Sequence, residues 1–143
     1  IQDMLDTVLE YDGLGLAAPQ VHQSVRLVVL SIDPDEGFEA WINPILTPTT
    51  DEQLINIEGC LSVPDLRGEV SRPNAIRVEA YDHQGQHFVR HLEGFPAAIA
   101  QHECDHLDGV LYVDKVDTQT LSFLSEWRRF GAHDDHDTGE GEE

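Results

Sequence analysis

The chain has 143 residues, 40% of them hydrophobic, which is typical of one domain with a single core. Its formal charge is −20, from 8 Lys and Arg against 28 Asp and Glu. A surface this acidic repels phosphate backbones, so direct binding to nucleic acid is not expected. No apolar run reaches the ~18 residues that a membrane span needs, and no signal peptide is recognisable.

A helical repeat of apolar side chains opens the chain and predicts an amphipathic helix that ends near residues 11–13. The glycine-rich stretch GLGLAAPQ, residues 13–20, is predicted to form a loop. The β-branched stretch 25–32 predicts a buried strand, and DPDEG at 33–37 predicts a turn. The helical repeat consists of Ile1, Met4, Leu5, Val8 and Leu9.

Three extended stretches follow in the middle of the chain. Residues 39–46 are predicted to be extended, with an interruption at Pro44. Residues 53–64 predict a short strand that runs into a loop. Residues 75–94 alternate in the manner of a β-hairpin, with Gly85 supplying the turn.

Two helices are predicted in the last third of the chain. The main helix covers residues 95–108, and a second covers 117–130, with Asp117 or Thr118 as its cap. Strands that come first, with antiparallel signals and interspersed helices, favour an α+β domain.

The stretch GAHDDHDTGEGEE, residues 131–143, carries six acidic residues and no Lys or Arg. Its two histidines could bind a metal, but so few apolar residues favour a solvated, disordered tail. We therefore expect a catalytic domain over residues 1–130, followed by an acidic tail.

The stretch QHECDHLDG contains the His-Glu-x-x-His pattern of metal hydrolases. On a helix, His102 and His106 lie one turn apart on the same face, so both imidazoles can reach one ion. Glu103 is offset by about 100° and can reach a water molecule on that ion. This is the arrangement of a general base beside a catalytic metal.

Two histidines leave the metal in need of a third ligand. One zinc-hydrolase class has its third histidine at the position that Tyr112 occupies here, so that class is excluded. Glu126 is not favoured as a ligand either, because it is expected to be an exposed acid of an amphipathic helix. Cys104 lies about 200° round the helix from the first histidine and is expected to be a buried thiol. Cys60 follows Gly59, which allows a close backbone approach. Cys60 is therefore the expected third ligand, on a site that suits Zn²⁺ or Fe²⁺.

Three stretches, GLGLAAPQ, EGCLSVP and QHECDHLDG, resemble in sequence and in order the three motifs of peptide deformylases. The resemblance covers nearly the whole chain, to about Phe130. It implies an α+β fold in which antiparallel strands surround a central helix that carries both histidines. It also implies removal of the N-formyl group from the initiator methionine of new bacterial-type proteins.

Carried over motif by motif, the resemblance makes Cys60, His102 and His106 the metal ligands and Glu103 the general base and acid. It implies ferrous iron as the metal, with zinc or nickel as substitutes.

The resemblance further implies two donors to the developing oxyanion, the side-chain amide of Gln20 and the backbone N–H of Leu61. Gly15 and its neighbours, together with Gly59, would lie along the peptide backbone of the substrate, which would add as a strand.

A methionine side chain needs a pocket, and four residues near the motifs are candidate walls. Arg67, shortly after the second motif, is a candidate for binding the carbonyl groups of the peptide. The candidate walls are Leu14, Phe95, Ala98 and Ile99.

The expected partners are N-formyl-methionyl peptides and nascent chains, met in the cytoplasm by a monomer that touches neither nucleic acid nor membrane. Docking to the ribosome through a basic end is not favoured, because only Arg128 and Arg129 precede the acidic tail. Two alternatives stay open. One is a metallopeptidase or other amidase with the same chemistry; the other is a family member that binds formyl-peptides without turnover.

Deletion of residues 131–143 is predicted to leave turnover of short formyl-peptides within about a factor of two, because all three motifs lie upstream. Thermal stability should rise slightly at low salt, since six like charges leave an acidic protein, and the gain should fade with added salt. A tenfold change in the Michaelis constant would instead mean that the tail covers the site.

Overall fold

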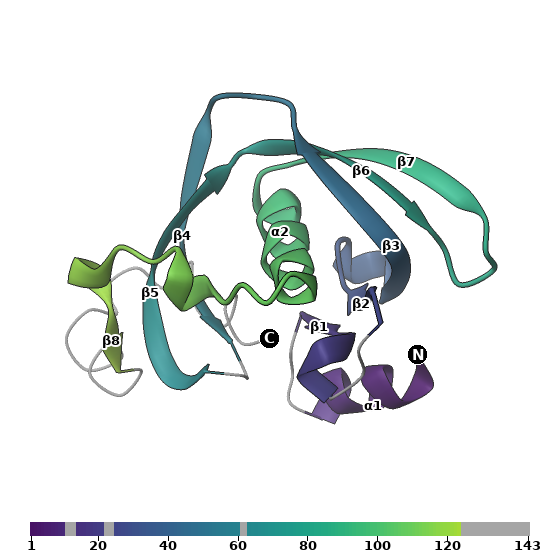
Figure 1. Cartoon of the computed structure of the whole chain (residues 1–143), viewed down its shortest axis with the longest axis horizontal. Coiled ribbons are helices and arrows are strands. Elements are labelled where there is room, and N and C mark those ends of the chain that lie inside the picture. The colour runs from purple at the N-terminus through teal and green to yellow at the C-terminus, as the bar shows by residue number, and fades with distance from the viewer. Residues whose placement is uncertain (11–13, 22–24, 61–62, 124–143) are drawn as a thin grey trace.

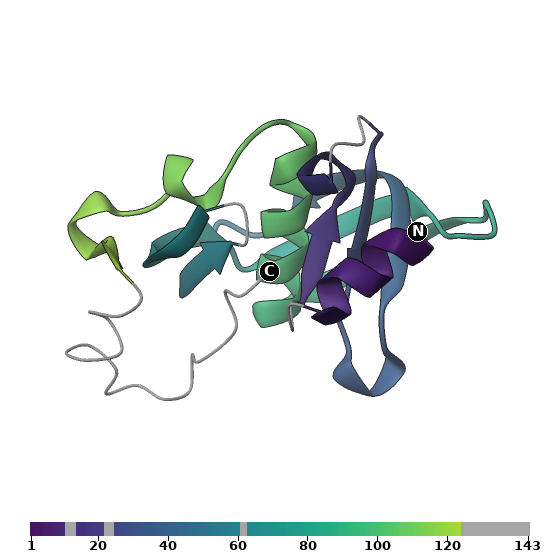
Figure 2. The ribbon, with the colours of Figure 1, turned by 90° about the horizontal axis from the view of Figure 1, so that it is seen from below.

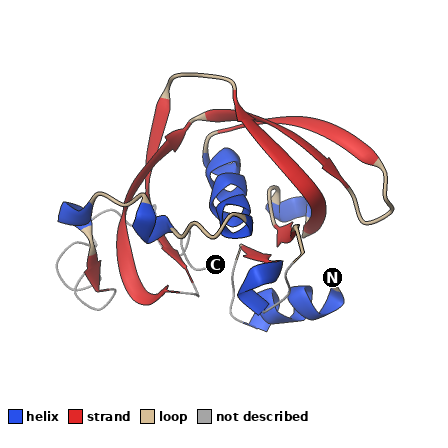
Figure 3. Cartoon of the chain, in the orientation of Figure 1, coloured by secondary structure: helices blue, strands red, loops and turns tan. Residues whose placement is uncertain are grey.

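The computed structural model describes residues 1–10, 14–21, 25–60 and 63–123, which form two α-helices and eight β-strands (Figure 1). Helices and antiparallel sheets together confirm the predicted α+β class, as Figure 3 shows. No helix in these four ranges is long and apolar enough to cross a bilayer. The elements are α1 (Gln2–Glu10), β1 (Gly15–Ala17), β2 (Leu27–Leu30), β3 (Glu39–Pro48), β4 (Gln53–Cys60), β5 (Val63–Pro73), β6 (Ala75–Tyr81), β7 (His87–Glu93), α2 (Phe95–Leu107) and β8 (Ser122–Phe123), with 3₁₀ turns at Ala18–Val21, Pro34–Glu36, Tyr112–Asp114 and Thr118–Thr120.

The larger sheet has the order β1-β2-β3-β6-β7, and every neighbouring pair is antiparallel. The predicted interruption of the third strand at Pro44 is a β-bulge, because the register shifts between Ile42 and Ile45 and Asn43 has φ 52°. The strand then continues to Pro48. The predicted hairpin is confirmed as β6 and β7, with Gly85 at φ 81° in its turn.

The smaller sheet has the order β4-β5-β8. In β4 and β5, Leu54 is opposite Arg72, and Glu58 is opposite Gly68. The loop expected after β4 was wrong for residues 63–64, because β5 begins at Val63 and pairs back along β4, while residues 61–62 lie outside the described residues.

Helix α2 lies between the two sheets, in contact with β1, β2 and β7 on one side and with β5 on the other (Figures 1 and 2). Its apolar residues join Trp41, Val28 and Ile76 in the main core. Helix α1 packs Met4 and Val8 against the other side of β1 and β2, which confirms the predicted amphipathic helix. Burial of these faces fixes α2 against the short edge strand β1.

Two further expectations were wrong. The stretch 13–20 is not simply a loop, because Gly15–Ala17 pairs with β2 as a strand and a 3₁₀ turn follows. The second helix is absent over 117–123, where β8 pairs instead with Leu66 and Arg67 of β5. Asp117 is a cap as predicted, but of a 3₁₀ turn, through a bond from the Gln119 N–H. Residues 124–143, with the rest of that helix and the tail, lie outside the described residues.

Candidate active site

Helix α2 brings three polar side chains of the third motif into the interior. His102, Glu103 and His106 are all buried, and their ligand atoms lie within 4.8 Å of one another. The two imidazole rings meet edge to face, with centroids 5.2 Å apart. The helical repeat therefore places two imidazoles and one carboxylate where they can surround a single ion.

Glu58, at the start of the second motif, holds His102 in place. The His102 Nδ1 and the Glu58 Oε1 are 2.8 Å apart, and both side chains are buried. With the proton on Nδ1 facing the carboxylate, Nε2 presents a lone pair. Such a carboxylate–histidine pair fixes the ring orientation and raises the basicity of a metal ligand.

Arg72 on β5 completes a buried ion pair with Glu58. Its Nε and one terminal nitrogen donate to the two oxygens of Glu58 at 2.7 and 2.9 Å, and the other donates to Asp105 at 2.8 Å. Burial acts to raise the pKa of Glu58, but the hydrogen bonds from Arg72 and His102 outweigh it and lower that pKa to about 2. Burial acts to lower the pKa of Arg72. The hydrogen bonds that Arg72 donates to Glu58 and Asp105 outweigh this effect and raise that pKa. Both groups are therefore charged at neutral pH.

Glu103 has the opposite environment. It is fully buried, and neither carboxylate oxygen has a hydrogen-bond partner among the described residues. Burial raises its pKa to about 7. Such a carboxyl group can hold or release a proton near neutral pH, as a general base and acid must.

Gly15 on β1 lies directly against Glu103. A Cβ at Gly15 would stand 2.7 Å from the Cγ of Glu103 and 3.0 Å from its Oε2. Only a glycine lets the edge strand approach this carboxylate so closely.

The donor set fits a divalent ion. Burial, followed by the charge of His102, lowers the pKa of His106 to about 4, so its imidazole is neutral and can donate a lone pair. The oxygens of Glu103, without a hydrogen-bond partner among the described residues, lie beside the two rings.

Cys60 ends strand β4, but its side chain lies outside the described residues. Cys104 does not belong to this group among the described residues; it packs in the main core, and burial raises the pKa of its thiol.

Gln20 lies in the 3₁₀ turn after β1, and its side-chain oxygen accepts a 2.8 Å bond from the N–H of Ala17. The other end of the amide, the NH₂ group, can only donate hydrogen bonds. Leu61, the other predicted oxyanion donor, lies outside the described residues.

Arg67 is buried, and one of its terminal nitrogens donates to the carbonyl of Leu66 at 2.7 Å. Its guanidinium lies over Gly59, where a Cβ would overlap with it. Gly59, just before Cys60, is thus a position where a side chain would displace this guanidinium.

A small hollow adjoins His102. Three of the four candidate pocket residues, Phe95, Ala98 and Ile99, line it, whereas Leu14 packs half-buried against the main core. Strand β4 supplies the other side of the hollow through Asn56, Ile57 and Glu58.

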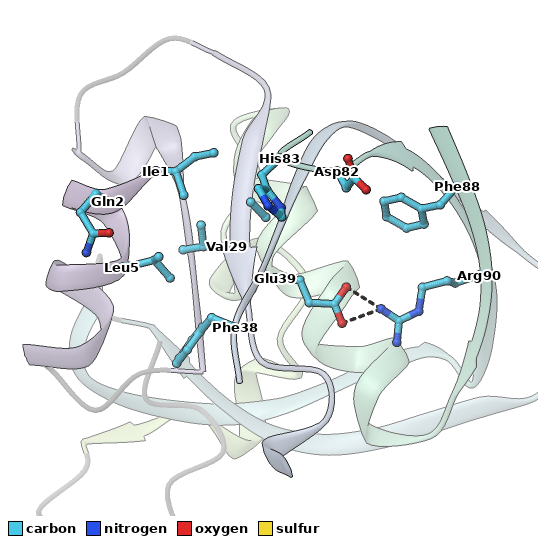
Figure 4. A pocket seen from close by; sticks show the side chains of 11 residues that line it. Ile1, Gln2, Leu5, Val29, Phe38, Glu39, Asp82, His83, Phe88 and Arg90 are labelled. Atoms are coloured by element: carbon cyan, nitrogen blue, oxygen red, sulfur yellow. Dashed lines mark hydrogen bonds and ion pairs between the residues drawn. The ribbon is translucent and has the colours of Figure 1, made fainter. Parts of the chain in front are cut away.

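A hollow of about 770 Å³ lies elsewhere, between α1 and strands β2, β3 and β7 (Figure 4). An ion pair of Glu39 with Arg90 crosses it, between apolar side chains such as Leu5 and Phe88. It contains no residue of the three motifs, so size alone does not locate the active site.

Sequence reasoning missed Glu58, Arg72 and Asn56. Glu58 stands two residues before Cys60, and that proximity could have singled it out. Nothing local marks Arg72 or Asn56, since their roles depend on the pairing of β4 with β5 and on the position of α2.

The family model for polypeptide deformylase matches residues 1–122 of the chain. The chain belongs to the polypeptide deformylase family. Members are metal-dependent hydrolases, and this chain is an enzyme that removes the N-formyl group from nascent polypeptides.

Three solved structures show the same relationship. The peptide deformylase from Thermotoga maritima is 40% identical, with TM-score 0.77 over 82% of this chain and 78% of that one. The Plasmodium falciparum peptide deformylase, in complex with an inhibitor, is 35% identical, with TM-score 0.76 over 90% and 77%. The class I type b enzyme from Acinetobacter baumannii, bound to Met-Ala-Ser, is 39% identical, with TM-score 0.73 over 79% and 76%.

Glu58→Gln is predicted to lower the free energy of unfolding by about 3 kcal/mol, because it leaves the buried charge of Arg72 undercompensated. Urea unfolding followed by circular dichroism measures this. Glu79→Gln is the matched control, since Glu79 pairs with Arg77 at the surface and its loss should not measurably shift the midpoint. Equal midpoints for both variants would contradict a structural role for Glu58.

Proposed function

We propose that this deformylase holds its metal through Cys60, His102 and His106 and moves the reaction's proton through Glu103. The observation that carries the proposal is the buried carboxylate of Glu103, which has no hydrogen-bond partner in the described part of the chain and lies beside two imidazoles. A buried carboxyl group without a partner destabilises a fold, so its presence favours a chemical role. The motif order, with Cys60 in the second motif, supports the third ligand.

We propose Fe²⁺ as the metal, with Zn²⁺ or Ni²⁺ able to substitute, since one thiolate and two imidazoles suit all three. When bound, such an ion lowers the pKa of a water molecule and polarises the formyl carbonyl. Glu58 keeps the Nε2 of His102 as the coordinating atom by accepting from Nδ1.

Glu103 takes a proton from the attacking water and returns it to the nitrogen that leaves as the free amine. A pKa of about 7 suits both transfers, because it costs little to protonate or deprotonate the group at neutral pH. The closeness of Gly15 excludes bulk solvent from one side of this carboxylate.

The negative charge that develops on the formyl oxygen when water adds to the carbon needs hydrogen-bond donors. We assign the NH₂ of Gln20 and the backbone N–H of Leu61. The bond from the Ala17 N–H to the Gln20 oxygen supports this role, because it orients the amide and leaves the NH₂ as the end that donates. Loss of one such donor typically costs ~3 kcal/mol of transition-state stabilisation.

The peptide is assigned to the edge strand β1, where Gly15 and Leu14 would lie along its backbone, with Gly59 and Arg67 on the opposite side. Edge strands have unpaired backbone groups that an extended peptide can join. The methionine side chain is assigned to the hollow beside His102. Its described walls include Phe95, Ala98 and Ile99.

The setting of the reaction is also part of the proposal. Helix α2, enclosed by antiparallel strands, is the central helix of the catalytic domain, for which we propose residues 1–130, followed by an acidic tail. We propose a cytoplasmic monomer that meets formylated nascent chains without binding nucleic acid or membrane. The charge of −20 supports the exclusion of nucleic acid.

Glu103→Gln is predicted to retain the metal and lose nearly all turnover, because the amide cannot move the proton. Iron-loaded, anaerobically prepared protein and variant would be compared for formate release from formyl-Met-Ala-Ser, with metal content from elemental analysis. Turnover near the parent rate would refute the base role. A parent protein that binds iron but releases no formate would refute the proposed function.

Cys60→Ala is predicted to abolish metal binding, and Cys104→Ala to leave it intact. Cys104 packs with Ala100 and Leu107 in the core, away from the two imidazoles, and serves as the matched control. Elemental analysis after dialysis measures the difference. Full metal content in the Cys60 variant would exclude that cysteine as a ligand.

A further inference from the structure

The hollow beside His102 contains one polar side chain that the proposed chemistry does not use, that of Asn56. Helix α2 contributes Phe95, Ala98, Ile99 and His102 to it, and the first three are apolar. Glu58 also lines it, but both its oxygens are bonded to Arg72 and one also contacts His102. Asn56 therefore decides the polarity of the hollow.

The position of Asn56 follows from strand geometry. Alternate residues of a strand share a face, so Leu54, Asn56 and Glu58 point the same way. The bond of Glu58 to His102 shows that this face of β4 is turned toward α2. The residue opposite Asn56 on β5 is the buried Val70, so the amide projects from an ordered, paired strand.

The substrate's first side chain must enter this hollow if the formyl group lies at His102 and His106. The formyl carbon and the methionine Cα are separated by one nitrogen, and thus by about 2.5 Å. The side chain consequently starts next to His102, which itself lines the hollow. The hollow holds about 10 Å³, so a methionine side chain enters it only when a lining side chain moves, and Phe95, 37% exposed, is the most exposed of these.

An amide in this place favours a particular chemical class of side chain. The Asn56 amide can donate two N–H bonds, whereas a thioether sulfur accepts only weakly and a hydrocarbon chain not at all. The oxygen of methionine sulfoxide is a strong acceptor at the same distance along the side chain. A site with a polar group rejects analogues that leave the group unpaired and accepts those that satisfy it.

We propose that Asn56 is a specificity-determining residue that lets this enzyme deformylate peptides beginning with formyl-methionine sulfoxide as well as formyl-methionine. Its amide donates to the sulfoxide oxygen within an otherwise apolar hollow. The inference rests on the proposed placement of the formyl group at His102 and His106.

The test compares formyl-Met-Ala-Ser, its sulfoxide and the formyl-norleucine analogue as substrates of the iron-loaded enzyme, with formate release as the readout. For the parent, kcat/KM for the sulfoxide should lie within about tenfold of that for formyl-methionine. Asn56→Leu should lower the ratio of sulfoxide to norleucine at least tenfold, since the donor is lost and the wall becomes apolar. Asn56→Asp keeps the shape of the side chain, but its carboxylate cannot donate a hydrogen bond. This variant should therefore also lower kcat/KM for the sulfoxide peptide.

Ile55→Ala is the matched control, because Ile55 is the neighbouring residue on β4, 62% exposed on the opposite face. For Ile55→Ala, the ratio of kcat/KM for the sulfoxide to kcat/KM for the norleucine analogue should equal that of the parent. An unchanged ratio in both Asn56 variants, with formate released from all three substrates, would overturn the proposal and leave the deformylase function standing.

Binding of the deformylated peptides gives a second readout that does not require turnover. Calorimetry with Met-Ala-Ser and its sulfoxide should show that Asn56→Leu raises the dissociation constant of the sulfoxide peptide tenfold. The dissociation constant of Met-Ala-Ser should stay unchanged. This result without formate release by the parent would support Asn56 and refute the proposed function. Equal weakening of both peptides would overturn the role of Asn56.

Discussion

The buried ion pair of Glu58 with Arg72 is the interaction on which the site depends. It joins strands β4 and β5 to each other and, through His102 and Asp105, to helix α2. Arg72 is almost fully buried, and a lone guanidinium there would be costly and would repel a cation at the neighbouring imidazoles. Glu58 neutralises that charge and at the same time orients His102. One carboxylate therefore makes the smaller sheet a structural support for the metal centre.

The charges around α2 differ on its two sides. Glu58 is held ionised by Arg72, with a pKa of about 2, whereas Glu103 is buried without such a partner and has a pKa of about 7. Two glutamates near the same histidine are thus suited to different roles, one to a fixed charge and one to the proton transfer that we propose. The difference arises from which strand faces each residue: β5 supplies an arginine, and β1 supplies only a glycine.

The parts of the fold that sequence alone could predict are those set by local pattern. The main helix, the hairpin at Gly85 and the approach of Glu103 to His102 and His106 follow from spacing within a few residues. Strand β1 was missed because three residues become a strand only by pairing with β2. The predicted second helix gave way over β8 to pairing with β5, since tertiary contacts override weak local propensity. Arg72 could not be assigned for the same reason, because its partners come from another strand and a helix.

Two glycines of the motifs matter for the space they leave, and neither Gly15 nor Gly59 has a positive φ among the described residues. A side chain at Gly15 would occupy the volume of the Glu103 carboxylate, and one at Gly59 would displace the guanidinium of Arg67. The backbone of the first motif thus lies against the Glu103 side chain of the third, and the guanidinium of the buried Arg67 lies against Gly59 of the second. Stretches far apart in the sequence are in this way constrained by one another's side-chain volumes. That constraint accounts for the glycines at positions 15 and 59.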